Sequence, residues 1–108
     1  MTNAMNVTFE DTELEQLVLK HKSRKYKKYE RDSKFLTALD RVYDDMRDVA
    51  KTSDLRLLSY MHYERLKKVG MSSVRVMNGR VERLLFREYN DGIEISIIEM
   101  DDTHYGRR

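Results

Sequence analysis

The pattern of apolar and polar positions predicts helices in the first half of the chain and strands in its last third. Apolar side chains recur every three or four positions through residues 35–50, and charged side chains occupy the opposite face. This spacing is typical of an amphipathic helix. The helix is expected to begin at Asp32 or Ser33, or earlier near Ser23, because a chain without proline leaves both starts open.

A shorter helix of two to three turns is predicted from residue 12 onward, where apolar positions again follow helical spacing. Thr12 and Glu15 have the arrangement of a capping box, in which the two side chains satisfy backbone amides at the start of a helix. Residues 7–9 form a short β-like segment ahead of it. Residues 1–6 are expected to lie outside the folded domain.

The last third alternates apolar and polar residues, which is typical of strands with one buried face. Three such runs cover residues 73–77, 80–89 and 93–100. The turn signals Asn78-Gly79 and Asn90-Asp91-Gly92 separate them. Three antiparallel strands joined by two tight turns are therefore predicted.

Together these elements predict a single α+β domain, since 108 residues are too few for two independent cores. Its expected architecture is an N-terminal αα hairpin packed on a small antiparallel sheet of three to four strands, with residues 7–9 at an edge. Residues 54–71 show no clean period. They are expected to form a loop that packs its apolar side chains under the helices.

The first predicted hairpin decides where two arginines lie. A two-residue turn at Asn78-Gly79 would place Arg75 and Arg83 on opposite faces of the sheet. A three-residue loop with Gly79 in a left-handed conformation would place both arginines on one face. The second register is favoured because it alone turns four apolar residues to the helices: Val74, Val76, Leu84 and Phe86.

Composition narrows the classes of site that the chain could carry. It has no cysteine, so disulfides and thiolate metal sites are excluded, and its three histidines are too far apart for a local metal motif. No nucleotide-binding fingerprint appears, and no cofactor is expected. Without a signal segment or an apolar run of about 18 residues, the protein is expected to be cytoplasmic and not bound to a membrane.

The net charge is only +2, but the charges are unevenly distributed. A basic block at residues 20–31 precedes an acidic one at residues 40–48. A basic block can follow a phosphate backbone, although a solvated helix face is the more common role of such a run.

The arginines of the predicted sheet are the main candidates for chemistry. Arg75 and Arg83, with Lys67 or Lys68 nearby, could hold a phosphodiester, and Glu64 and His104 could act as base and acid. Such a set would cleave RNA through its own 2′-hydroxyl without a metal. The alternative is that the arginines are ordinary exposed strand positions paired with glutamates.

Four segments together resemble the RelE superfamily of bacterial toxins, most closely its HigB and YoeB branches. They are residues 63–67 (YERLK), 73–76 (SVRV) and 78–86 (NGRVERLLF), and the pair His104-Tyr105. The resemblance extends over residues 7–105 and implies the RelE-like fold.

The resemblance implies an endoribonuclease that cleaves mRNA at the ribosomal A site and is silenced by a cognate antitoxin. By position, Glu64 would be the general base, Arg83 the main phosphate clamp and His104 the general acid. Tyr105 would orient or stack on a base. The supporting cations would be Lys67, Lys68 and Arg75, together with Lys25 and Lys28 of the basic block. Two alternatives remain open: a ParE-like inhibitor of DNA gyrase, and a protein-binding module without enzymatic activity.

Overall fold

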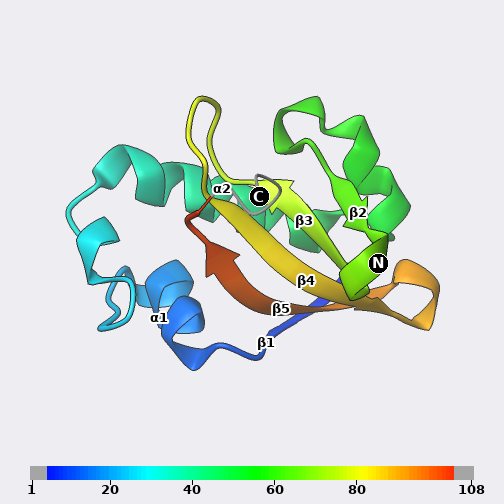
Figure 1. The fold of residues 1–108 in the computed structure, drawn as a ribbon, viewed down its shortest axis with the longest axis horizontal. Helices are drawn as coiled ribbons and strands as arrows, with labels where there is room; N and C mark the ends of the chain where they lie inside the picture. Colours follow the sequence, from blue (N-terminus) through cyan, green and yellow to red (C-terminus); the bar gives the residue numbers. More distant parts are fainter. Residues whose placement is uncertain (1–4, 104–108) are drawn as a thin grey trace.

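A computed structural model describes residues 5–103 and shows a mixed α+β domain with a five-stranded sheet (Figure 1). The helices are α1 (Thr12–Lys20) and α2 (Ser33–Asp48). The strands are β1 (Asn6–Phe9), β2 (Glu64–Leu66), β3 (Met71–Arg75), β4 (Arg83–Tyr89) and β5 (Glu94–Asp101). Short 3₁₀ turns occur at Lys27–Tyr29, Thr52–Leu57, Ser59–Met61, Lys67–Val69 and Asn90–Gly92.

The sheet is larger than the pattern predicted, and it is mixed. Its strand order is β1-β5-β4-β3-β2, in which β1 runs parallel to β5 and the other neighbours are antiparallel. The prediction of three to four antiparallel strands missed β2, because three residues are too few to show a period. The helices α1 and α2 lie in the connection that carries the chain from β1 to the rest of the sheet.

The N-terminal boundary also differs from the expectation. Met5 is buried in the core, and its amide donates a hydrogen bond of 3.0 Å to the carbonyl of Arg47. Asn6 begins β1, opposite Glu94. Of the six residues that were expected outside the domain, these two belong to it.

Each helix is started by an aspartate. Asp11 Oδ1 accepts from the amides of Glu13 and Leu14, at 3.0 and 3.2 Å, so Asp11 is the N-cap of α1. The expected capping box at Thr12 is therefore wrong, and Thr12 is the first helical residue. Asp32 Oδ1 caps α2 by accepting from the amide of Phe35 at 3.1 Å. The predicted start of α2 at Asp32 or Ser33 is therefore confirmed.

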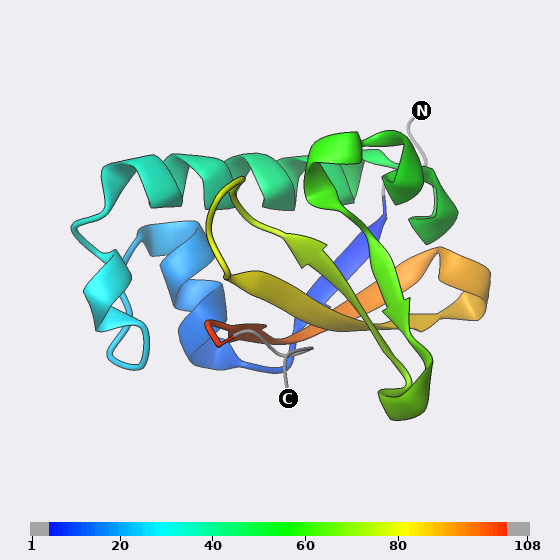
Figure 2. The ribbon, with the colours of Figure 1, turned by 45° about the horizontal axis from the view of Figure 1, so that its top comes forward.

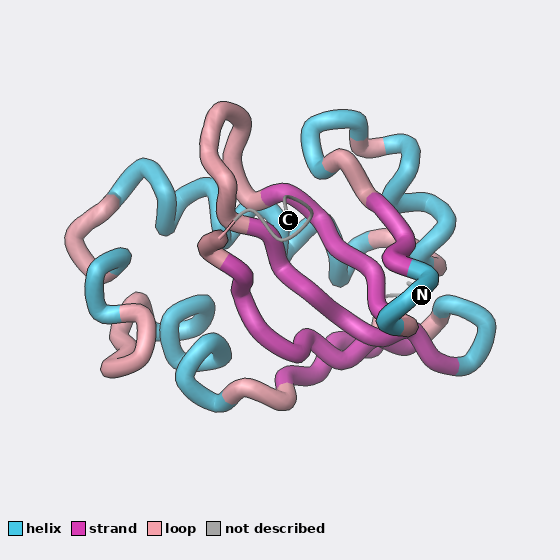
Figure 3. The backbone as a smooth tube through the Cα atoms, viewed as in Figure 1, coloured by secondary structure: helices cyan, strands magenta, loops and turns pink. Residues whose placement is uncertain are grey.

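The alternative start of α2 near Ser23 is wrong, because the basic block lies in a connecting segment with one short 3₁₀ turn (Figure 3). Two glutamates hold this segment. Glu13 Oε1 accepts from the Ser23 hydroxyl at 3.0 Å, and Glu30 Oε2 accepts from the Ser23 amide at 2.8 Å. These bonds satisfy the amide and the hydroxyl of Ser23, so the segment is held without helical hydrogen bonds at this position.

Both helices contribute to the core on one side of the sheet. Figure 2 shows α2 lying along that side, with α1 next to the N-terminal half of α2. The inward row of the sheet includes Val74, Leu84, Phe86, Ile95 and Ile97, all fully buried. Residues 54–71 pack partly as predicted, since Leu55 and Met61 are fully buried while Leu57 is 81% exposed.

The β3–β4 hairpin has the register that the apolar pattern favoured. Val74 lies opposite Leu84, and Arg75 lies opposite Arg83. The amide of Arg80 donates to the Met77 carbonyl at 3.2 Å, and Gly79 between them has φ +83°. Because glycine adopts positive φ without a steric cost, it allows the turn that sets this register.

A buried cluster of polar groups fixes the hairpin loop to α2. Glu82, which is 6% exposed, accepts from the Tyr29 hydroxyl at 2.9 Å and from Arg80 at 3.1 and 3.2 Å. Arg80 Nη1 also donates to Asp32 Oδ2 at 3.0 Å. The Arg80 hydrogen bond, followed by the one from Phe35, lowers the pKa of Asp32, while burial and then the bond to Glu82 raise the pKa of Tyr29.

The glycines of the two β-turns allow a test of backbone strain against steric contact. We expect Gly79→Ala to lower the free energy of unfolding by about 1 kcal/mol, because φ is positive but no atom lies within 4 Å of the added Cβ. Gly92→Ala, at φ +88°, would also bring its Cβ to 2.5 Å from Thr52 Oγ1, which bonds Glu88. We expect Gly92→Ala to lower the free energy of unfolding by about 3 kcal/mol. Urea unfolding of both variants checks the difference; equal losses would contradict it.

Candidate functional site

The face of the sheet turned away from the helices carries the predicted chemistry in two neighbouring rows. Arg75, Arg83 and Asp101 lie side by side on β3, β4 and β5. The next row contains Glu64 on β2, Ser73 on β3, Leu85 on β4 and Glu99 on β5. We call this surface the open face because it is turned away from α1 and α2, although Ser73, Arg83 and Leu85 on it are buried. The two rows bring together residues that are up to 37 positions apart in the sequence.

Arg83 is the centre of the open face and is held in one orientation. It is only 8% exposed. Its Nε donates to the Ser73 hydroxyl at 3.0 Å, and its Nη2 donates to the His62 carbonyl at 2.6 Å. Glu64 Oε1 lies 3.9 Å from the same Nη2 and belongs to a side chain that is 55% exposed. The predicted base and the predicted clamp are therefore neighbours.

Arg75 is the second cation of this row. It lies directly opposite Arg83 across the strand pair, and its Nη1 donates to Asn78 Oδ1 at 3.5 Å. Like charges directly opposite each other in a sheet are unfavourable by themselves. Asp101, on the other side of Arg83, offsets part of that repulsion. Glu64, 3.9 Å from Arg83 Nη2, offsets more of it.

Lys67 and Lys68 do not join this group. They form the turn Lys67–Val69 between β2 and β3, next to Met71 at the opposite end of β3 from Arg75. Arg75 is four positions along β3 from Met71, a distance of about 13 Å. Both lysines are exposed. The predicted set of phosphate-binding residues is thus divided between the two ends of the sheet.

Lys25 and Lys28 lie nearer to Arg83, but carboxylates already pair with them. Lys25 Nζ is 2.8 Å from Asp11 Oδ2, and Lys28 Nζ is 3.0 Å from Asp102 Oδ2. Asp102 follows Asp101, the β5 neighbour of Arg83, so Lys28 is at the same end of the sheet as Arg83. Between these lysines and the end of β5 is a cleft of about 290 Å³ whose walls carry both signs of charge.

The tyrosines of the basic block are structural. Tyr26 and Tyr29 are 6% and 2% exposed, so their rings are unavailable for stacking on a base. The Tyr26 hydroxyl donates to Asp11 Oδ2 at 2.7 Å and accepts from the Met100 amide at 3.3 Å. Burial first, then the bond to Asp11, raises the pKa of Tyr26 to about 12.

The predicted acid and its neighbour, His104 and Tyr105, lie outside the described residues. The described chain ends at Thr103, whose amide and hydroxyl both donate to Asp101 Oδ1, at 2.8 and 2.7 Å. This turn comes directly after the row that contains Arg83.

Sequence reasoning missed two members of the open face. Ser73 orients Arg83, and Asp101 flanks it. Both follow from the strand alternation once the register is known, because Ser73 is two residues from Arg75 and therefore on the same face. The contact between Glu64 and Arg83 depends on β2, which pairs Glu64 with Ser73.

Residues 5–103 contain no group of three or more acidic or histidine side chains placed to hold a metal ion. The same part of the chain has no helix of the length and apolar character needed to cross a bilayer. Comparisons with known proteins found no family model, no curated protein and no solved structure that matches this chain.

The Asp11 cluster predicts a pH dependence of stability. Burial opposes ionisation of Asp11, but hydrogen bonds from Lys25, Tyr26 and the Leu14 amide outweigh it, so the pKa of Asp11 is lowered. A lowered pKa stabilises the folded state above the ordinary value near 4, and this stabilisation is lost as the pH falls through the folded-state pKa.

We therefore expect Asp11→Asn, which retains an N-cap acceptor, to cost about 1 kcal/mol at pH 7 and progressively less in acid. Urea unfolding between pH 3 and pH 7 measures the difference from wild type. Asp48→Asn, at an exposed position, is the control and should show little change. If Asp11→Asn lowered the free energy of unfolding equally at pH 3 and at pH 7, the role of the Asp11 carboxylate would be contradicted.

Proposed function

We propose that this chain is the toxin of a bacterial toxin–antitoxin pair, a metal-independent endoribonuclease that cleaves mRNA at the ribosomal A site. The observation that carries the proposal is the arrangement around Arg83. A fixed guanidinium has a second arginine opposite it and a half-exposed carboxylate 3.9 Å away, all on one open face. Two cations and a base are what cleavage through the RNA 2′-hydroxyl requires.

In the proposed reaction, Glu64 accepts the proton of the 2′-hydroxyl, and the 2′-oxygen attacks the adjacent phosphorus. The bond from phosphorus to the 5′-oxygen of the next nucleotide breaks. The products are a 2′,3′-cyclic phosphate and a free 5′-hydroxyl, whose oxygen receives its proton from His104. No water and no metal enters this step, and the protons balance between the two side chains.

Arg83 suits the role of phosphate clamp because hydrogen bonds hold it in one orientation. A hydroxyl and a backbone carbonyl, from Ser73 and His62, accept two of its hydrogen bonds. A preorganised cation stabilises the charge that develops on the phosphate oxygens without reorganising during the reaction. Arg75, on the neighbouring strand, would hold the second non-bridging oxygen.

The remaining assignments extend the proposal along the chain. His104 and Tyr105, which follow the described residues, would supply the acid and a stacking group. Lys28, at the same end of the sheet as Arg83, would exchange its partner Asp102 for an RNA phosphate. The proposed partners are the ribosome with its mRNA in the cytoplasm, and a cognate antitoxin that covers the open face.

The proposal predicts the effects of Arg83→Ala and Glu64→Gln. Each should reduce mRNA cleavage by about 100-fold or more, because each removes a group that acts in the transition state. The measurement is cleavage of mRNA on purified ribosomes, with 5′ ends mapped and growth followed after induction in cells. Arg87→Ala removes an exposed arginine from the same face of β4 and should leave cleavage unchanged.

The outcomes separate the alternative functions. Growth arrest with DNA damage and intact mRNA would overturn the nuclease in favour of gyrase inhibition. Wild-type protein that neither arrests growth nor cuts mRNA would favour a binding module. Urea unfolding of Arg83→Ala is the necessary control, since the loss of a buried arginine can also destabilise the fold.

A further inference from the structure

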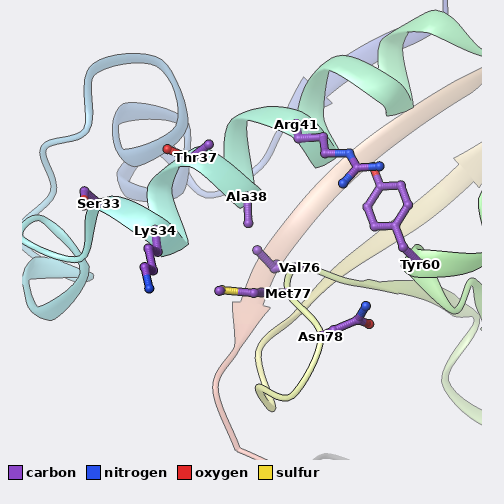
Figure 4. A pocket seen from close by; sticks show the side chains of 9 residues that line it. All are labelled: Ser33, Lys34, Thr37, Ala38, Arg41, Tyr60, Val76, Met77 and Asn78. Carbon is purple, nitrogen blue, oxygen red and sulfur yellow. The ribbon is translucent and has the colours of Figure 1, made fainter.

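A groove of about 540 Å³ lies on the helix side of the hairpin loop, away from the open face (Figure 4). One wall is the N-terminal half of α2, and the other is the loop that follows β3. Its volume is within the range of about 300–1,000 Å³ that is typical of ligand sites. Nothing in the proposed nuclease chemistry uses it.

The floor of the groove is formed by apolar side chains, and the small residue Ala38 on α2 leaves space above them. Ala38 and Val76 point toward each other between the helix and the loop, and the Met77 side chain lies below Val76 (Figure 4). Val76 is buried, whereas Ala38 and Met77 are partly exposed. A longer side chain at position 38 would fill this space, so the floor can receive an apolar side chain from outside.

The rim of the groove is cationic. Lys34 and Arg41 lie on the same stripe of α2 as Ala38, and no aspartate or glutamate is among the described residues that line the groove. Among the described residues no carboxylate lies within 4.0 Å of Lys34 Nζ, but its charge helps to lower the pKa of Asp32, after the hydrogen bonds from Arg80 and Phe35. Arg41 stacks over the Tyr60 ring at 4.0 Å and lies 3.9 Å from Asp45, beyond the rim.

Neutral polar groups complete the walls. The residues that line the groove also include Ser33 and Thr37 on α2 and Asn78 on the loop, which carry hydroxyl and amide groups. Such groups both donate and accept hydrogen bonds, as the main chain of an extended peptide requires. An apolar floor, neutral groups for a peptide backbone and cations at the rim together describe one kind of occupant.

We propose that this groove binds a short peptide segment of a partner protein in which acidic residues flank an apolar one. The apolar side chain enters between Ala38 and Met77, and the carboxylates pair with Lys34 and Arg41. The interaction does not depend on the nuclease proposal, because the cations of the open face take no part in it.

The test is selection of a random-peptide phage library on the wild-type protein, followed by affinity measurements on synthetic copies of the selected peptides. We expect enrichment of peptides with aspartate or glutamate next to leucine, phenylalanine or another large apolar residue. Lys34→Glu should weaken their binding about tenfold or more, because it places a like charge against the peptide carboxylates. Ala38→Trp, which fills the floor, should abolish binding.

Lys51→Glu is the matched control, with the same charge change at an exposed position beyond the C-terminal end of α2, and it should leave binding unchanged. Lys34→Glu is expected to fold, because a glutamate in the first turn of a helix is favourable. It therefore keeps the test decisive if Ala38→Trp does not fold. Arg83→Ala should retain binding, which separates this result from the nuclease test.

Three results would overturn the proposal. The first is that no selected peptide loses affinity for Lys34→Glu or Ala38→Trp. The second is that groove-dependent peptides are basic or lack acidic residues. The third is a wild-type dimer that Lys34→Glu converts to monomer, which would make a second copy of the chain the occupant.

Discussion

Gly79 and the cluster of Arg80 with Glu82, Tyr29 and Asp32, here called the Arg80 cluster, hold β3 and β4 in one register. This register places Arg75 opposite Arg83 and Val74 opposite Leu84. A slip of one residue in either strand would turn its side chains to the wrong face. The core would then lose Val74 or Leu84, and the two arginines would no longer share a surface. The same register therefore determines both the packing under the helices and the charge on the open face.

The Arg80 cluster raises the free-energy cost of changing that register. Glu82 is buried, and a buried carboxylate is tolerated only when it is paired and hydrogen-bonded. Its donors come from two other places in the chain: Tyr29 from the 3₁₀ turn before α2, and Arg80 from the hairpin loop. Because Arg80 also reaches Asp32, the N-cap of α2, movement of the loop would leave several charges unpaired at once.

Local patterns in the sequence were sufficient for α2 and for the β3–β4 hairpin. The period of residues 35–50 and the Asn78-Gly79 signal are both short-range, and the apolar alternation selected between two registers. The pairing of β1 with β5 and the existence of β2 were not accessible in this way, because they depend on contacts between distant segments. For the same reason the open-face position of Arg75 and Arg83 was predictable, while the separation of Lys67 and Lys68 from them was not.

The distribution of charge explains how a nearly neutral chain could bind a polyanion. The basic block at residues 20–31 is the most conspicuous cationic feature of the sequence, yet Asp11 and Asp102 pair with Lys25 and Lys28. At Arg83 the Ser73 hydroxyl and the His62 carbonyl accept hydrogen bonds, the Glu64 carboxylate lies 3.9 Å away, and the neighbouring strand adds Arg75. Affinity for phosphate depends on the potential at the site where the phosphate binds. Because Arg75 and Arg83 share one row of the sheet, a phosphate bound there would meet two guanidinium groups at once, while Glu64 and Asp101 beside Arg83 reduce the positive potential.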